Sequence, residues 1–458
     1  MAHPRPLDAS QRLVVRGAEI DGRGPFDVGI VGSVIASIGP RLAPTAGDEV
    51  LEARGGALLP GVRDHHLHLR ALAAARASVA CGPPDVRTPG ELWAALRGAA
   101  AGAGWVRGVG YHESVAGPLG RIELDDAVSD RPVRIQHRSG QLWMLNSRAA
   151  ELAGLDASHD GRLLHADRWV RDRLGPEPGL VAGLAEIGAL LARFGVTGVA
   201  DATADNTAED ERTLPDALEQ EVLVMGGAGA SGGPRKIMLH DDQLPGLDEL
   251  TGIVSSAHRH GRAVAVHVVS RASLWLTLTA LADAGPLDGD RIEHGSVIPP
   301  DAVGTIARLG ITVVTQPNFV AERGDAYLHD VDTEDLPWLY RVAGLRRAGV
   351  AVAGGTDAPY GDADPWRAMA AAVERCTATG AVLGPAERVS PEEALALFTG
   401  TLRRPETPAQ VRPGAPGDLC LLEVPWRAAR GQLSSDLVAA TIRGGRILHR
   451  AGEPIAPR

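Results

Sequence analysis

Residues 263–295 read AVAVHVVSRASLWLTLTALADAGPLDGDRIEHG, and in this stretch two β-rich runs flank a run rich in leucine and alanine. This pattern is typical of a strand, a helix and a second strand. The alternation continues on both sides of the stretch. It predicts strands at Ala57–Leu59, Val196–Ala200, Glu221–Met225, Lys236–Leu239, Ala263–Val269, Arg291–Glu293, Ile311–Thr315 and Val350–Ala353. Strand–helix alternation indicates an α/β fold with a parallel sheet, and eight repeats predict a closed TIM-like (β/α)8 barrel.

Helices are expected between the later strands, and an insertion is expected between the first two. The helical runs cover Leu247–His260, Ala272–Ala284, Pro300–Leu309 and Leu339–Ala348. The insertion, at about residues 70–190, is less regular and holds further β-rich runs at Trp105–Tyr111 and Val133–His137. A doubly wound open sheet is the alternative, but no GxGxxG motif follows an early strand.

Both ends of the chain are β-rich. The first end has short β runs at Arg12–Arg16, Phe26–Val31 and Val34–Ile38, separated by glycines. The other end contains GAPGDLCLLEV (414–424) and AATIRGGRILH (439–449), which also indicate strands. We therefore expect a small β-sandwich composed of residues 1–57 and 403–458, and a barrel over residues 58–402.

Composition and charge narrow the class of protein. The chain is 44% hydrophobic and 22% charged, as in soluble globular enzymes. Its net charge of −11 argues against nucleic acid or an anionic membrane as a partner, because both require basic surfaces. A small-molecule substrate is expected instead, and a homodimer is a candidate assembly.

The cysteines and the hydropathy pattern predict a cytoplasmic protein. Cys81, Cys376 and Cys420 are scattered and form no CxxC motif, so neither disulfides nor a thiolate metal site is expected. The first residues lack the apolar run of a signal peptide. No stretch approaches the roughly 18 apolar residues that span a bilayer.

Titratable side chains gather where the predicted strands end, which is where TIM-type barrels carry their active sites. His66 and His68 are two residues apart in RDHHLHL, so in an extended segment both point to the same side. His267, His294 and Asp357 end three further predicted strands. Histidine and carboxylate ligands suit zinc or a similar divalent ion.

Lys236 is the single lysine among the 46 basic residues of the chain. It lies on the predicted fourth strand. An ordinary ammonium group would repel nearby metal ions, whereas a lysine carboxylated by CO2 is an anion with two oxygens that can bridge two cations. Arginine cannot take that role because its guanidinium stays charged and non-nucleophilic. The alternative is a structural ion pair on the rim of the barrel.

These motifs together resemble the amidohydrolase superfamily. The resemblance rests on PGVRDHHLHL (60–69), Lys236, His267, RIEHG (291–295) and GGTDAPYG (354–361), with GAPGDLCLL and TIRGGRI at the end of the chain. WVRGVGY (105–111), residues 125–155 and RAVAVHVVSRAS (262–273) resemble the amidohydrolase family 3 branch, which holds N-substituted formamide deformylases. The resemblance spans nearly the whole chain.

The resemblance assigns roles to these residues. It implies that His66 and His68 bind one metal ion, that His267 and His294 bind a second, and that Lys236 bridges both. Asp357 would touch the first ion and serve as acid and base. The implied reaction is hydrolysis of a non-peptide C–N bond, in an amide, formamide or cyclic amide, by metal-activated hydroxide.

Some positions depart from the family pattern and put the substrate in doubt. Histidine stands at position 65 where the family usually has a small residue, and Gln141 stands where the branch commonly has a histidine. The run LHDDQLP (239–245) replaces an acidic residue followed by glycine. Substrate contacts are expected from the insertion and from the loop after the seventh strand. The candidates are Tyr111, His112, Gln141, Asn146, Asn318, Arg323 and Tyr327.

Other functions fit the same residues. One is a deaminase-type or other C–N hydrolase with a single metal ion and an uncarboxylated lysine. Another, of a different class, is a catalytically inactive barrel that binds a ligand. Hydrolysis of phosphoesters or lactones could use the same two ions, but no GxxxxGK[ST] phosphate loop is present.

Overall fold

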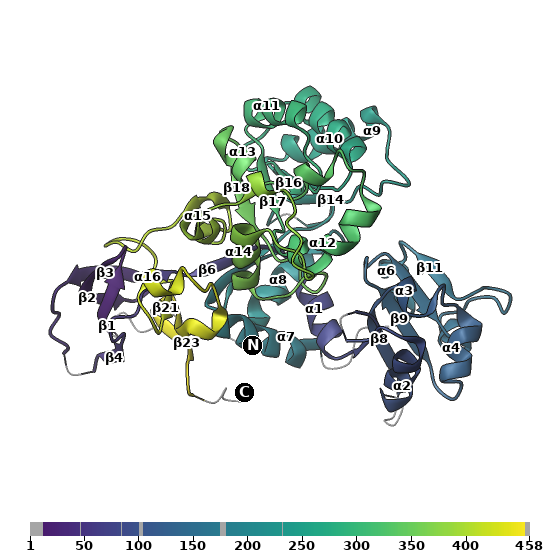
Figure 1. Ribbon diagram of the computed structural model, residues 1–458, viewed down its shortest axis with the longest axis horizontal. Coiled ribbons are helices and arrows are strands. Elements are labelled where there is room, and N and C mark those ends of the chain that lie inside the picture. The colour runs from purple at the N-terminus through teal and green to yellow at the C-terminus, as the bar shows by residue number, and fades with distance from the viewer. Residues whose placement is uncertain are drawn as a thin grey trace. The chain divides into compact units, whose positions relative to one another are not determined.

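The computed structural model describes residues 12–45, 47–83, 85–99, 104–174, 180–230 and 232–453 (Figure 1). The chain divides into two compact units. The first comprises residues 1–68 and 188–458, and the second comprises Leu69–Ile187. Each unit is described below by itself.

Eight parallel strands form the centre of the first unit. A three-stranded sheet has the order β13-β12-β6, and a five-stranded sheet has the order β14-β15-β16-β17-β18. The strands are β6 (Val62–Leu67), β12 (Val196–Asp201), β13 (Glu221–Val224), β14 (Arg235–Ile237), β15 (Val264–Val268), β16 (Arg291–His294), β17 (Thr312–Thr315) and β18 (Val352–Gly354). Nearly all their residues are buried, as expected for strands covered on both faces.

The two parallel sheets are linked by backbone hydrogen bonds at both ends. Gly226 forms an isolated parallel bridge with Arg235, which joins the segment after β13 to β14. On the other side, the Asp357 N–H donates to the His66 carbonyl at 2.7 Å, and the His68 N–H donates to the Ala358 carbonyl at 2.8 Å. No strand ladder pairs β18 with β6 among the described residues. The fold is therefore mixed α/β, and the closed barrel stays a prediction.

Helices alternate with these strands. They are α7 (Leu180–Arg193), α8 (Ala208–Ala217), α9 (Leu247–Arg259), α10 (Arg271–Ala284), α11 (Pro300–Leu309), α12 (Asn318–Asp330), α13 (Ala343–Arg347), α14 (Pro365–Glu374) and α15 (Pro391–Ala396). Helices α9, α10 and α11 lie side by side along the five-stranded sheet (Figure 1). Helix α10 begins at a capping box in which Ser270 accepts from the Ser273 N–H. Helix α11 ends at Gly310, which adopts a left-handed conformation with a φ of 67°.

Two sequence expectations about these elements were wrong. The first strand of the parallel set is Val62–Leu67, whereas Leu58–Pro60 (β5) pairs with β21 in a different sheet. The apolar run is broken at Pro60 and Gly61, where a Cβ on Gly61 would lie 2.3 Å from the Thr197 Oγ1. The helix expected from Leu339 starts only at Ala343, because Leu339 bridges to Val297 instead.

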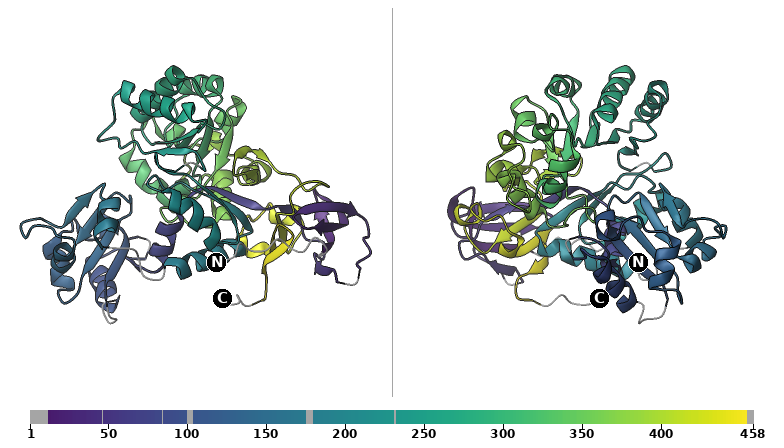
Figure 2. Two further views of the ribbon diagram at one scale, coloured as in Figure 1. Left: turned by 180° about the vertical axis from the view of Figure 1, so that it is seen from behind. Right: turned by 45° about the vertical axis from the view of Figure 1, so that its right-hand side comes forward.

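Strands from both ends of the chain lie side by side in the first unit (Figure 2). One sheet has the order β3-β2-β1-β4, with β1 (Arg12–Ile20), β2 (Arg23–Val31), β3 (Val34–Gly39) and β4 (Glu49–Glu52). The other has the order β23-β22-β21-β5, with β21 (Leu419–Leu422), β22 (Val438–Arg443) and β23 (Arg446–Arg450). One hydrophobic cluster contains Leu13 and Ile30 from the first sheet and Leu421 and Ile442 from the second. Both ends thus contribute to one core, as burial of apolar faces requires.

The second unit has a five-stranded sheet of its own, in the order β11-β10-β9-β8-β7. The strands are β7 (Val79–Ala80), β8 (Val106–Tyr111), β9 (Val133–His137), β10 (Leu142–Leu145) and β11 (Arg162–Leu164). Strands β7, β8 and β9 are parallel, while β10 and β11 are antiparallel to their neighbours. The helices are α1 (Leu69–Arg76), α2 (Pro89–Ala99), α3 (Glu113–Ala116), α4 (Arg121–Ala127), α5 (Ser147–Leu152) and α6 (Asp167–Leu174). None of the described helices of either unit has the length and apolar character needed to cross a bilayer.

Candidate metal centre

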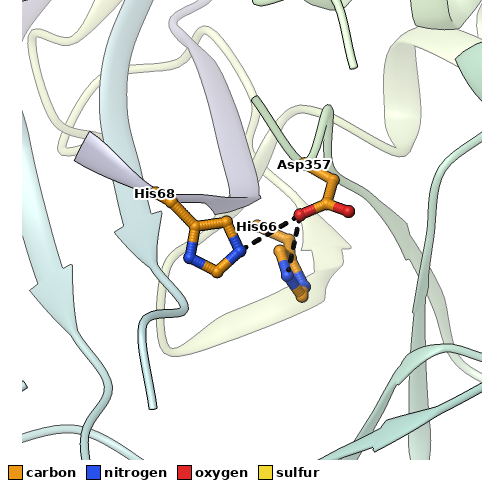
Figure 3. Close-up of side chains that lie close together, drawn as sticks. All are labelled: His66, His68 and Asp357. Atoms are coloured by element: carbon orange, nitrogen blue, oxygen red, sulfur yellow. Dashed lines mark hydrogen bonds and ion pairs between the residues drawn. The ribbon is translucent and has the colours of Figure 1, made fainter. Parts of the chain in front are cut away.

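Three of the expected ligands meet at the end of β6 (Figure 3). His66 lies in β6, His68 follows it directly, and Asp357 lies in the loop after β18. The Oδ1 of Asp357 is 3.1 Å from the Nε2 of His68 and 3.4 Å from the Nε2 of His66. One ligand atom from each residue lies within 4.8 Å of the others. This geometry could hold a metal ion.

The two further histidines lie beside this triad. The ring of His294, at the end of β16, is centred 4.7 Å from the ring of His66 and 4.5 Å from that of His267 in β15. The Nδ1 of His294 lies 3.9 Å from the Oδ2 of Asp357. His294 and Asp357 both adopt positive φ angles, of 68° and 58°. Such angles are uncommon outside glycine and cluster at functional sites.

Lys236, on β14, lies buried in the same neighbourhood. Its Nζ has no hydrogen-bond partner among the described residues. Burial lowers the pKa of Lys236 to about 8, although the carboxylates of Glu293 and Asp357 act in the opposite direction. A pKa near 8 leaves a much larger neutral fraction of this amine at neutral pH than an exposed lysine has.

Three of these histidines, His66, His267 and His294, are held in their neutral form. Burial, followed by the charge of Lys236, lowers the pKa of His66 well below its ordinary value and that of His267 to about 3. Burial and the neighbouring histidines also hold the pKa of His294 well below its ordinary value. A neutral imidazole keeps a lone pair for a metal ion, so the electrostatics of this site favour cation binding over protonation.

Glu293 orients His66, and sequence reasoning missed it. This fully buried carboxylate accepts a short hydrogen bond from the Nδ1 of His66 and two from the guanidinium of Arg291. Burial raises the pKa of Glu293, but Arg291 and Lys236 more than offset this, and the net pKa lies below its ordinary value. The signal was present in RIEHG, where Arg291 and Glu293 share one face of a strand.

We expect Glu293→Gln to weaken metal binding by roughly 10–100-fold, because a carboxylate behind a histidine fixes its tautomer and raises its basicity. The dissociation constant of Zn²⁺, measured by calorimetry on the full chain, checks this expectation. Glu322→Gln is the matched control, since Glu322 lies on α12 and bonds Asn318 rather than a histidine. Equal affinities for both variants would contradict the assigned role.

Asp64 ties β6 to the loop that carries Asp357, and the sequence analysis did not single it out. Its buried carboxylate accepts from the N–H of His66 at 3.0 Å, from the N–H of Thr356 at 3.1 Å and from the hydroxyl of Thr356 at 2.5 Å. Burial raises the pKa of Asp64 to about 7 despite these hydrogen bonds. The contacts fix the distance between His66 and Asp357.

His65, which directly precedes His66 in the sequence, is fully buried. Neither ring nitrogen of His65 has a hydrogen-bond partner among the described residues. Burial and the charge of Arg291 hold its pKa well below the ordinary value. It is a packed neutral imidazole.

Two of the three candidates on α12, Asn318 and Arg323, contact the loop that carries Asp357. The amide of Asn318 donates to the Thr356 carbonyl at 3.0 Å, and its Oδ1 has no partner among the described residues. Arg323 donates a short hydrogen bond to the Tyr360 carbonyl and stacks over the ring of Phe319 at 4.2 Å. The hydroxyl of Tyr327 is 3.1 Å from that of Tyr340. Arg323 is thus engaged within the protein, and a substrate contact by Arg323 stays a prediction.

The remaining candidates belong to the second unit. Tyr111 is buried and its hydroxyl donates to the Gly117 carbonyl, and burial raises its pKa to about 12. Gln141 is half-buried at the start of β10. His112 caps α3. The hydroxyl of Tyr111 is thus engaged within the second unit, and a substrate contact by Tyr111 stays a prediction.

Asn146 was expected to contact substrate, and its geometry shows a structural role instead. It is fully buried at the start of α5. Its Oδ1 accepts from the N–H groups of Val133 at 2.9 Å and Ala149 at 3.0 Å. Its Nδ2 donates to the carbonyls of Val128 and Arg131, both at 2.9 Å. Since an amide side chain offers two donors and two acceptor sites, no group remains for a substrate.

We expect Asn146→Ala to destabilise the second unit by roughly 2–4 kcal/mol, because the change removes a helix cap and leaves buried backbone groups unpaired. Urea unfolding of the full chain measures the effect. Gln141→Ala should change the free energy of unfolding by less than about 0.5 kcal/mol. If Asn146→Ala left stability unchanged but raised KM, Asn146 would be a substrate contact after all.

Comparison with known proteins places this geometry in context. A family model described as "Amidohydrolase family" matches residues 49–449. The N-substituted formamide deformylase of Arthrobacter pascens is 26% identical, over 87% of each chain. Among solved structures, an uncharacterized metal-dependent hydrolase from Pyrococcus horikoshii superimposes with a TM-score of 0.72 at 20% identity, covering 90% of this chain and 97% of the other. A variant of an atrazine chlorohydrolase from Arthrobacter aurescens, complexed with zinc and atraton, gives a TM-score of 0.56 at 13% identity and covers 97% of each chain.

Proposed function

The chain belongs to the amidohydrolase family, and on that premise we propose that it is a metal-dependent hydrolase of a non-peptide C–N bond in an amide, formamide or cyclic amide. The observation that carries the proposal is the convergence of His66, His68, His294 and Asp357 from three separate strands. Neutral imidazoles beside a carboxylate form a ligand set that suits zinc.

The residues present fit a metal ion, and we propose a pair of them. His66, His68 and Asp357 would hold one ion, and His267 and His294 the other. The Nε2 of His66 is buried without a hydrogen-bond partner among the described residues. A buried polar atom of this kind is costly unless a ligand satisfies it. When bound, a divalent ion lowers the pKa of water and polarises a carbonyl oxygen.

Lys236 would bridge the two ions after reacting with CO2. Carbamate formation requires the neutral amine, and the pKa of about 8 supplies it near neutral pH. An uncharged or anionic group at this position also removes the repulsion that an ammonium would exert on the ions. The buried Nζ has no hydrogen-bond partner among the described residues. In the carbamate, the two oxygens attached through this nitrogen would bind the metal ions.

Asp357 is proposed as the acid and base. Its carboxylate lies within 3.4 Å of two histidine nitrogens and stands on a loop held by Asn318 and Asp64. From this position it would accept a proton from the attacking water and return it to the leaving nitrogen. Protonation of that nitrogen lets the C–N bond break without expelling an amide anion.

The proposed substrate class includes N-substituted formamides, because one relative that aligns over 87% of this chain is an N-substituted formamide deformylase. The test is a screen of N-formyl amines, N-acyl amines and cyclic amides with the Zn²⁺-loaded full chain. We expect release of an amine from at least one of these groups. Absence of any hydrolysis by folded, metal-loaded protein would support the inactive ligand-binding barrel instead.

Metal analysis separates the proposal from its nearest alternative. About two equivalents of metal per chain at the residues around Asp357, falling in the Lys236→Ala variant, are expected for the bridged pair. A single equivalent that survives Lys236→Ala would favour a mononuclear, deaminase-type hydrolase.

A further inference from the structure

A second group of metal-ligating side chains lies wholly within the second unit. His112 follows β8 directly, Glu113 begins α3, and His137 ends β9. Strands β8 and β9 are parallel neighbours, with Tyr111 paired to His137. The carboxyl ends of two parallel strands therefore bring the three side chains to one edge of the sheet, the place where open α/β sheets bind ligands.

The three side chains face one another. One ligand atom from each lies within 4.8 Å of the other two. The Nε2 of His137 is 3.0 Å from the Oε2 of Glu113, and the rings of His112 and His137 are centred 5.9 Å apart. The side chain of His137 is 15% exposed and that of Glu113 is 41% exposed. The group is thus open to an ion from solvent.

Each histidine is oriented in the same way by a serine two residues further along the chain. The Nδ1 of His112 lies 2.8 Å from the Oγ of Ser114, and the Nδ1 of His137 lies 2.8 Å from the Oγ of Ser139. A proton on Nδ1, donated to the serine oxygen, leaves Nε2 with a lone pair for a metal ion. The N–H groups of the same serines lie 3.2 and 3.1 Å from Nδ1 and favour the other tautomer. A metal ion bound to Nε2 would select the tautomer that carries the proton on Nδ1.

We propose that His112, Glu113 and His137 bind a divalent transition-metal ion, of which zinc is the best match. Two imidazoles and a carboxylate are a common ligand set for zinc, and three protein ligands leave a coordination position for water or a small anion. These three residues belong to the second unit, whereas the residues around Asp357 belong to the first, and the inference does not depend on the function proposed for them. The alternative is a plain ion pair between Glu113 and His137, with His112 serving only as the N-cap of α3.

Zinc titration of the full chain tests the proposal. Calorimetry and elemental analysis compare the parent with His137→Gln and Glu113→Gln, each checked for folding by its thermal transition. His159→Gln is the matched control, because His159 lies in the same unit outside the group. We expect both ligand variants to bind one Zn²⁺ per chain fewer than the parent, and the control to bind the same number. Equal zinc content in all four proteins would overturn the proposal.

Two further experiments distinguish Zn²⁺ bound by the second unit from metal ions bound by the residues around Asp357. The titration is repeated in a His66→Ala/His68→Ala background, where Zn²⁺ binding by the second unit should persist and should vanish with His137→Gln. Ser139→Ala should raise the dissociation constant roughly 10–100-fold without unfolding the protein, since it removes the acceptor of the Nδ1 proton. If Ser139→Ala and the parent bound Zn²⁺ equally, or if the background retained no zinc while folded, the site would not exist.

Discussion

Replacing Asp357 by asparagine is expected to lower kcat by roughly 10²–10⁴-fold while most of the bound metal remains. Asparagine has nearly the same shape and can keep an oxygen near His66 and His68, which lie 3.4 and 3.1 Å from the aspartate Oδ1. It cannot accept the proton of an attacking water or return it to a leaving nitrogen. Turnover is measured on whichever amide the substrate screen identifies, with metal content determined on the same sample.

The matched control for this variant is Asp362→Asn. Asp362 stands in the same loop, is half-exposed, and pairs with Arg367 rather than with a histidine. We expect its kcat to stay within about twofold of the parent, because surface changes of this kind alter stability and geometry little. Undiminished turnover in Asp357→Asn would remove Asp357 as the acid and base. Loss of metal together with turnover would leave it a ligand only.

Lys236→Ala is expected to abolish measurable hydrolysis and to lower the metal content. Replacing a residue that hydrogen-bonds a metal ligand lowers metal affinity or activity by roughly 10–100-fold, and the loss of a bridging ligand should have a larger effect. Lys236→Arg should be equally inactive, because a permanent cation in this buried position repels metal ions and cannot form a carbamate. A small carboxylate such as acetate, added to Lys236→Ala, should restore part of the activity by occupying the space of the carbamate. Kinetics with and without acetate measure the rescue.

The pKa of Lys236 adds a pH dependence to this prediction. Its lowering to about 8 means that the reactive neutral amine increases as pH rises toward 8. Metal loading of the apoprotein in bicarbonate buffer should therefore be more complete at pH 8 than at pH 6. Full activity in Lys236→Arg, or loading that does not depend on added bicarbonate, would contradict the carbamate and favour the mononuclear alternative.

Strong local patterns account for the elements that sequence reasoning identified correctly. The runs at β15 and β17 are short and rich in β-branched residues, whereas the run at α10 is long and rich in the helix formers leucine and alanine. The error at Leu58–Pro60 arose because one continuous run of sequence contributes a strand to each of two sheets. The break between β5 and β6 becomes visible only from their pairing with β21 and β12, which are distant in the sequence. The late start of α13 has the same origin, since Leu339 and Tyr340 pair with the segment around Val297.

For the site, the sequence alone determined which residue types stand at the ends of strands: four histidines, one aspartate and one lysine among 46 basic residues. Strand periodicity and the parallel arrangement then predicted that they lie near each other. The structure places these side chains near each other.

Only the tertiary structure decided which polar side chains support the site and which support the fold. Glu293 and Asp64 gained their roles from partners far away in the chain, His66 and Thr356, which no local pattern encodes. In the sequence, Asn146 and Arg323 look like candidates for substrate contact, but in the structure their side chains donate hydrogen bonds to backbone carbonyls. The physical reason is that buried polar groups must find partners, and the partner within reach depends on the packed arrangement of distant segments.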